Sequence, residues 1–88
     1  MNCEIILKGH VLQMPDFSAT REEIIEAGIA DGLQIDNGWI LSRPLQRGQD
    51  KEFPEHAIGR VTKIVGHGEI VRFHPHIYLT AISPEDNA

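Results

Sequence analysis

The run AIGRVTKIVGHGEIVRFHPHIYLTAI, residues 57–82, decides the fold that the sequence predicts. Apolar and polar residues alternate on both sides of Gly66-His67-Gly68, which predicts two β-strands joined by a three-residue turn. Gly68 suits the left-handed last position of such a turn, because glycine adopts positive φ at little steric cost. The turn would place Ile64 opposite Ile70 in an antiparallel hairpin.

The second strand of this hairpin divides its side chains by chemistry, since alternate residues of a strand point to opposite faces. One face takes the apolar residues Val71, Phe73, Pro75, Ile77, Leu79 and Ala81. The other face takes Ile70, Arg72, His74, His76, Tyr78 and Thr80. Arg60, in the strand before the turn, lies on this second face too. We expect the apolar face in the core and the second face as a cationic and aromatic strip. Pro75 has no N–H to donate, so we expect a bend or an edge position there.

The length of 88 residues suits one small domain, which we expect over residues 1–82, with residues 83–88 as a disordered polar tail. A hydrophobic fraction of 41% and a charged fraction of 24% are typical of a soluble globular protein. Because a core of this size is thin, we expect a homo-oligomer that buries one sheet face.

The net charge of −5 argues against general nucleic-acid binding, which usually shows a basic excess, although it is compatible with a local basic patch. The sequence shows no secretory signal, lipidation motif or apolar run of membrane-spanning length, so we expect a cytoplasmic protein without a membrane anchor. The single cysteine, Cys3, excludes an internal disulfide and is expected to be a small apolar side chain of a first strand.

Residues 3–12, CEIILKGHVL, predict that first strand, with Gly9 marking a bulge or a close approach of another backbone. Alternation places Val11 on the core face. Ile6 and Leu12 fall on the polar face, which indicates that this face is partly covered.

Residues 18–27 predict the only helix. Thr20 and Glu23 form a capping-box pattern, and Gly28 is placed to end the helix. Three glutamates of this segment, Glu22, Glu23 and Glu26, are expected on a solvated helix face. The alternative is a carboxylate cluster for a metal ion or a basic partner.

Asp36-Asn37-Gly38 lies between the apolar runs 32–35 and 39–42, which predicts a second hairpin. Residues 43–55 have no periodicity and predict a long loop. The predicted fold class is therefore a small single α+β domain in the order β-α-β-β-β-β, with one short helix. Its sheet is mostly antiparallel, and strongly curved or closed as a small barrel.

His74 and His76 would point to the same face of a strand, so both imidazoles could bind one metal ion. With Gly68 they give the pattern G-x5-H-x-H, which resembles the first metal motif of the cupin family over nine residues. That motif continues with a glutamate, and the family has a second histidine motif. Residues 77–82 contain no acid and only 12 residues follow His76, so these residues do not carry the cupin site.

The cationic and aromatic strip suggests a second chemistry, the binding of an anion. Its candidate ligand-binding residues are Arg60, Arg72, His74, His76 and Tyr78. The paired N–H donors of an arginine guanidinium and the imidazole N–H groups suit the oxygens of a phosphate, and a tyrosine ring can stack on a base. The alternative is a hydrated sheet face on which Arg72 pairs with Glu69 or Glu4.

No nucleophile elbow, phosphate-binding loop, dinucleotide fingerprint or paired-cysteine motif occurs in the sequence. We therefore expect a non-enzymatic binding or regulatory module that grips a protein partner or a small anionic or nucleotide ligand, without a cofactor. The alternatives are a small metal-dependent enzyme that uses His74 and His76, and a host-directed inhibitor or immunity protein.

Overall fold

The computed structural model describes residues 3–45, 62–73 and 77–85 of the chain. In chain order the elements are β1 (Cys3–Leu7), β2 (His10–Met14), β3 (Ser18–Thr20), α1 (Arg21–Ala30), β4 (Ile40–Pro44), β5 (Thr62–Ile64), β6 (Ile70–Arg72) and β7 (Ile77–Ile82). The predicted α+β class, with one short helix and a mostly antiparallel sheet, is confirmed. Among the described residues, no helix is long and apolar enough to cross a membrane.

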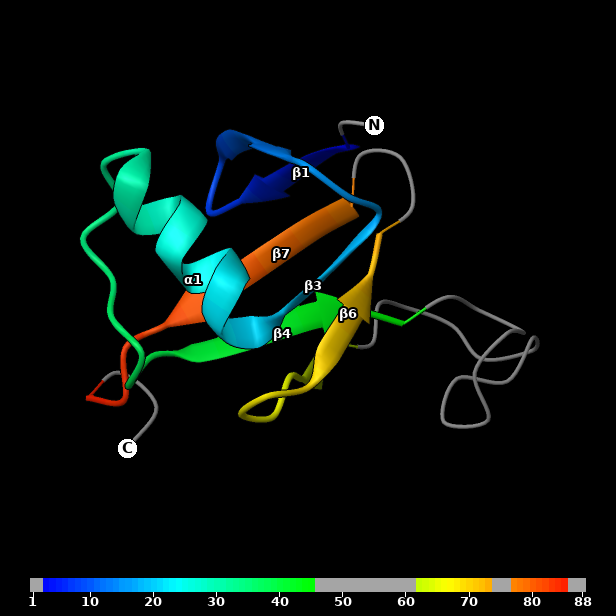
Figure 1. Ribbon diagram of the computed structural model, residues 1–88. Helices are drawn as coiled ribbons and strands as arrows, with labels where there is room; N and C mark the ends of the chain where they lie inside the picture. Colours follow the sequence, from blue (N-terminus) through cyan, green and yellow to red (C-terminus); the bar gives the residue numbers. More distant parts are fainter. Residues whose placement is uncertain (1–2, 46–61, 74–76, 86–88) are drawn as a thin grey trace.

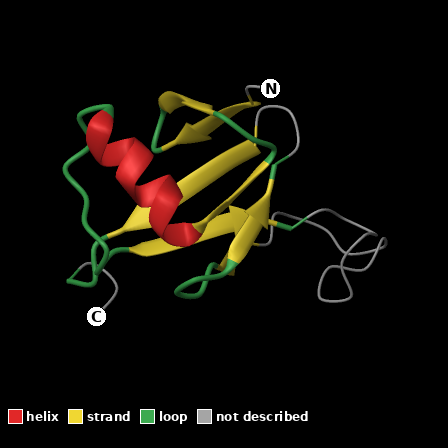
Figure 2. Ribbon diagram, viewed as in Figure 1, coloured by secondary structure: helices red, strands yellow, loops and turns green. Residues whose placement is uncertain are grey.

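The described strands form two sheets (Figure 1). The larger has the order β2-β1-β7-β4-β5, and the smaller pairs β3 with β6. β1 and β7 run parallel at the centre of the larger sheet, whereas the other pairs are antiparallel. The N-terminal hairpin and the C-terminal strand therefore belong to the same sheet. α1 lies across one face of this sheet and forms a second layer (Figure 2).

The predicted first strand over residues 3–12 is wrong, because the chain reverses at Lys8 and Gly9. These two residues have φ angles of +49° and +81°, the two positive values that a tight two-residue hairpin turn requires. The turn pairs Leu7 with His10 and Ile5 with Leu12, so it resets the alternation. Leu12 is consequently buried and Val11 exposed, the reverse of the prediction.

The capping box predicted at Thr20 is confirmed. The Thr20 hydroxyl accepts from the Glu23 N–H at 3.2 Å, and the Thr20 N–H donates to the Glu23 carboxylate at 3.1 Å. The predicted end at Gly28 is wrong, since α1 continues to Ala30. Asp31 caps the helix, and the φ of +98° at Gly32 then lets the Leu33 N–H reach the Gly28 carbonyl at 3.0 Å.

The turn predicted at Asp36-Asn37-Gly38 forms, but the hairpin around it does not. The Gly38 N–H donates to Asp36 Oδ1 at 2.7 Å, and the Trp39 N–H to the Asp36 carbonyl at 3.0 Å. Residues 33–36 are not a strand. β4 pairs instead with β5 and β7, strands that follow it much later in the chain.

The hairpin predicted over residues 57–82 is also wrong in its pairing, although its turn is present. Gly68 has a φ of +75°, as predicted, and the Glu69 N–H donates to the Gly66 carbonyl at 3.0 Å. The two arms then enter different sheets: Ile64 lies opposite Ser42, and Ile70 lies opposite Thr20. The predicted Ile64–Ile70 pair therefore does not exist.

The alternation predicted for the second arm is confirmed at every described position. The buried residues are Val71, Phe73, Ile77, Leu79 and Ala81, and the exposed ones are Ile70, Arg72, Tyr78 and Thr80. Pro75 and the bend expected there lie outside the described residues, as do most of the predicted loop 43–55 and the last three residues of the predicted tail. Within that loop, Arg43 and Pro44 belong to β4.

The core lies between α1 and the larger sheet. Its fully buried side chains include Ile5 and Leu7 of β1, Ile24 and Ile25 of the helix, and Leu41 of β4. Burial of each such side chain contributes about 1.5–3 kcal/mol to the free energy of folding, relative to an exposed position. Cys3 is buried and free, as predicted for a small apolar side chain.

Candidate functional site

Two of the five predicted ligand-binding residues lie in the described part of the chain. Arg72 is on β6 and Tyr78 is on β7, and both side chains are exposed. Arg60, His74 and His76 lie outside the described residues, so the predicted metal-binding histidines do as well.

Arg72 and Tyr78 belong to different sheets. Arg72 lies opposite Ser18 in the β3–β6 ribbon. Tyr78 lies beside Ile6 at the centre of the larger sheet. Where the structure is described, the strip predicted for one hairpin face is thus divided between two surfaces.

The surface around Tyr78 is the face of the larger sheet that points away from α1. Strand register places Ile6 between Val11 of β2 and Tyr78 of β7, so these three side chains form one row across three strands. Tyr78 is 65% exposed and Val11 is 51% exposed. An aromatic ring and a branched aliphatic side chain are therefore presented to solvent around a half-buried isoleucine.

Two further rows continue this face across β7, β4 and β5. Ser42 lies between Thr80 and Ile64, and Ile40 lies opposite Ile82. Ile64 is 63% exposed. We call the apolar members of these rows the open sheet face: Ile6, Val11, Ile40, Ile64, Tyr78 and Ile82.

Four polar side chains beside the open sheet face form hydrogen bonds in two pairs. The Ser42 and Thr80 hydroxyls form a hydrogen bond with each other across β4 and β7. At the edge formed by β1 and β2, the Gln13 amide donates to the Glu4 carboxylate at 3.1 Å. A partner that covers this face would therefore not leave these hydroxyls without hydrogen bonds.

The sequence identified Tyr78 but missed most of this face. Ile6 carried a signal, because it is an isoleucine on the side of the first strand that alternation assigns to solvent. Val11 was assigned to the core because the turn at Lys8-Gly9 was not recognised. Ile64 was assigned to a hairpin pair with Ile70 that the structure does not contain.

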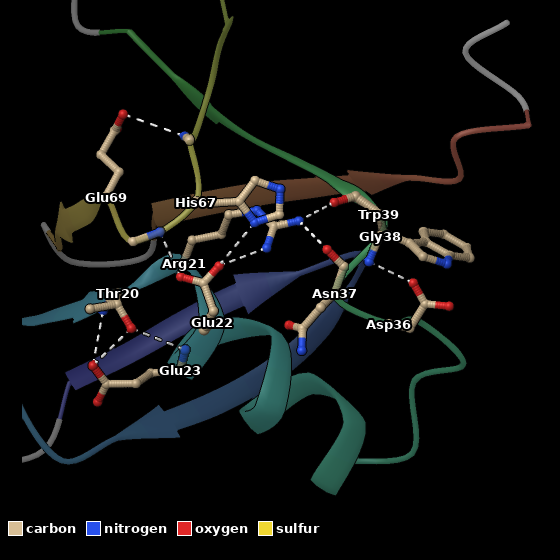
Figure 3. A network of polar contacts seen from close by, with 12 residues as sticks. Thr20, Arg21, Glu22, Glu23, Asp36, Asn37, Gly38, Trp39, His67 and Glu69 are labelled. Carbon is tan, nitrogen blue, oxygen red and sulfur yellow. Dashed lines mark hydrogen bonds and ion pairs between the residues drawn. The ribbon is translucent and has the colours of Figure 1, made fainter.

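A polar network surrounds the start of α1 (Figure 3). The Arg21 side chain is 3% exposed and donates to the carbonyls of Asn37, at 2.8 Å, and of Trp39. It also donates to the Glu22 carboxylate at 2.9 Å. One buried guanidinium thus links the first turn of the helix to the turn before β4, a role that no sequence pattern indicated.

Glu22 extends the network to the turn before β6. Its Oε1 accepts the Gly68 N–H at 2.7 Å, and its Oε2 lies 3.5 Å from His67 Nδ1. The Gly68 N–H, and after it the Arg21 side chain, lower the pKa of the Glu22 carboxyl, although partial desolvation acts in the opposite direction. Glu22 is therefore an ionised structural anchor rather than a free member of a carboxylate cluster.

Metal binding finds no support in the described part of the chain. There, no group of three or more His, Cys, Asp or Glu side chains is arranged to hold a metal ion. His10 Nδ1 lies 2.9 Å from Asp31 Oδ2, a two-residue contact that joins β2 to the end of α1.

The open sheet face and the Arg21–Glu22 network differ in what they can do. The network is centred on the buried Arg21 side chain and its groups are hydrogen-bonded to one another, so it fixes the position of two turns. The open sheet face is apolar and largely exposed, the chemistry that contact surfaces for other macromolecules have. Comparisons with protein-family models, with curated proteins and with solved structures found no match for this chain.

Proposed function

We propose that this protein is a binding or regulatory module that contacts a protein partner through the open sheet face. One observation carries the proposal. Of the seven large apolar side chains exposed in the described part of the chain, four lie on this face: Val11, Ile64, Tyr78 and Ile82. Soluble monomers rarely expose apolar side chains in contiguous groups unless the group binds something.

The chemistry of the face suits a protein partner. Tyr78 stands near its centre, and tyrosine is among the residues that contribute most to binding energy at interfaces. The hydroxyls of Ser42 and Thr80 bond to each other, so covering them costs little. Glu4 and Gln13 supply a polar margin at one edge, as interfaces between proteins usually have.

The partner is either another protein or a second copy of this chain, the homo-oligomer expected from the small core. Sedimentation of the purified protein distinguishes these two cases. A dimer that dissociates when Tyr78 is replaced by serine favours the second copy. A monomer over the whole concentration range favours a different protein.

A photo-crosslinking side chain at Tyr78 tests the proposal in the cells that produce the protein. The matched control carries the same crosslinker at Gln34, an exposed residue of the loop after α1. We expect one discrete adduct from position 78 and none from position 34, with the adduct lost when Ile64→Ser and Ile82→Ser are added. Equal adducts at both positions, or none from position 78, would refute the assignment of this face.

A further inference from the structure

A second surface lies where β4 ends beside β6. Three described residues, Arg43 of β4 and Ile70 and Arg72 of β6, line a hollow of about 470 Å³. Ser42 points to the open sheet face, so Arg43, the next residue of the strand, points to the opposite side of the sheet. The hollow is therefore separate from the surface proposed to bind a protein.

The described lining of the hollow is positively charged, although the chain is acidic. The sequence has 13 Asp and Glu residues and 8 Lys and Arg residues, yet the described lining contains two arginines and no carboxylate. By contrast, Arg21 is paired with Glu22 at 2.9 Å. Neither Arg43 nor Arg72 has an ion pair with any described carboxylate.

The backbone holds the two arginines in place without neutralising them. Arg43 lies opposite Lys63, another cationic residue, in the β4–β5 ladder. Arg72 lies opposite Ser18, a neutral residue, in the β3–β6 ribbon. An anion bound in the hollow would supply the counter-charge that the described strands do not provide to Arg43 and Arg72.

The chemistry of the lining restricts the ligand. A guanidinium presents a planar fork of donors that matches phosphate and carboxylate oxygens, and two such forks suit a dianion better than a monoanion. Ile70 is 65% exposed and adds an apolar wall. A volume of about 470 Å³ falls within the range of small-molecule sites and far exceeds what a phosphate ion alone would fill.

We infer that this hollow binds a small organic phosphate monoester, with the phosphoryl group between Arg43 and Arg72 and the organic part against Ile70. The site does not depend on the open sheet face. Failure of one proposal would leave the other standing.

Phenyl phosphate is the probe that tests this site, since it combines a phosphoryl dianion with an apolar ring. We would titrate it at pH 7.5 and low ionic strength and follow the backbone amide NMR signals of Ile70 and Arg72. Inorganic phosphate and phenol, measured separately, report the contributions of the anion and of the ring. Benzoate, with a single negative charge, tests whether the site prefers a phosphoryl group to a carboxylate.

The variants Arg43→Gln and Arg72→Gln each remove one fork, and Lys8→Gln is the control. Lys8 lies in the β1–β2 turn, 4.8 Å from the centre of the Trp39 ring, so this control loses the same charge away from the hollow. Amide spectra of the free variants verify that each is folded. Arg72 is exposed on β6, so its variant decides the question if Arg43→Gln does not fold.

The inference requires that phenyl phosphate shift the amide signals of Ile70 and Arg72. Its affinity should be at least tenfold weaker in each arginine variant and unchanged in Lys8→Gln. Weaker binding of inorganic phosphate, phenol and benzoate than of phenyl phosphate is also required. An equal loss of affinity in Lys8→Gln would show that binding depends on the net charge of the protein and not on the hollow. Undiminished binding in the arginine variants, or phenol binding as well as phenyl phosphate, would overturn the site.

Discussion

The backbone N–H of Gly68 lies 2.7 Å from Oε1 of Glu22, a hydrogen bond between residues 46 positions apart. It connects the first turn of α1 to the turn that precedes β6. The Arg21 N–H, at the start of the same helix, donates to the Glu69 carbonyl at 2.9 Å. The helix start therefore holds the turn before β6 by two hydrogen bonds, and β6 carries Ile70 and Arg72, which line the hollow.

The lowered pKa of Glu22 predicts an acid-sensitive contribution to stability. Its ordinary value is 4.5, and the folded state lowers it because the ionised carboxylate accepts from Gly68 and Arg21. The contribution is present above the unfolded value and is lost as the pH falls through the folded value. We expect Glu22→Gln to lower the melting temperature at pH 7 and to show a smaller decline than the parent below pH 4.5.

Glu26→Gln is the matched control for that comparison, because Glu26 is an exposed residue of the same helix and its replacement removes the same charge. Melting temperatures between pH 3 and pH 7, measured for all three proteins, check the prediction. Parallel curves for the parent and Glu22→Gln would contradict it.

Replacing Arg21 by methionine should destabilise the protein by about 3 kcal/mol. The substitution keeps an unbranched side chain in a buried position, but it removes the guanidinium that donates to the Asn37 and Trp39 carbonyls and takes one of its donors from the Glu22 carboxylate. Urea denaturation measures the loss. Arg72→Met, on an exposed position of β6, should change the free energy of unfolding by less than about 0.5 kcal/mol.

Gly28→Ala should destabilise the protein by about 1 kcal/mol, although alanine is the better helix former by about that amount. An added Cβ would lie 2.9 Å from Leu7 Cδ2, 3.1 Å from Leu33 Cδ1 and 3.2 Å from Ile35 Cδ1. Leu7 and Ile35 are buried, so these methyl groups have little space to move aside.

The pair Gly28→Ala and Leu7→Val tests the steric reason directly. If the clash with Leu7 is the cause, the double variant should be more stable than the sum of the single effects predicts. Urea denaturation of the parent, the two single variants and the double variant measures the four free energies of unfolding that this double-mutant cycle needs. A Gly28→Ala protein more stable than the parent would show that the helix end moves freely from the sheet.

Tyr78→Ser should leave the free energy of unfolding within about 0.5 kcal/mol of the parent, because the ring is mostly solvated in the monomer. The same change should raise solubility, since it removes the largest side chain of the open sheet face. Precipitation by polyethylene glycol measures this, with Gln34→Ser as the control. A loss of more than about 2 kcal/mol would instead make Tyr78 part of the folded core or of an obligate dimer interface.

Local patterns in the sequence were interpreted correctly where a few neighbouring residues decide the outcome. The Thr20–Glu23 capping box depends on residues three apart, and the turn at Gly68 depends on glycine's freedom of φ. The alternation along residues 70–82 follows from strand geometry alone. Each of these features would form in nearly any fold that used the segment.

Pairing between distant segments was not predictable in the same way. Asn37-Gly38 and Gly66-His67-Gly68 each favoured a hairpin, and in both places the turn formed while its arms paired elsewhere. Arm pairing depends on which distant strands bury the most apolar surface together. Two local predictions were wrong as well: the unrecognised Lys8-Gly9 turn misplaced Val11 and Leu12, and Gly28 does not end the helix.

The sequence by itself determined the cap of the helix, the left-handed turn at Gly68 and the apolar face of residues 70–82, because steric freedom and side-chain alternation act over a few residues. Only the tertiary structure decided that Tyr78 lies beside Ile6 and that Arg72 shares a hollow with Arg43. Those neighbours come from strands far apart in the chain. Their positions are set by the joint burial of the core, which no single segment contains.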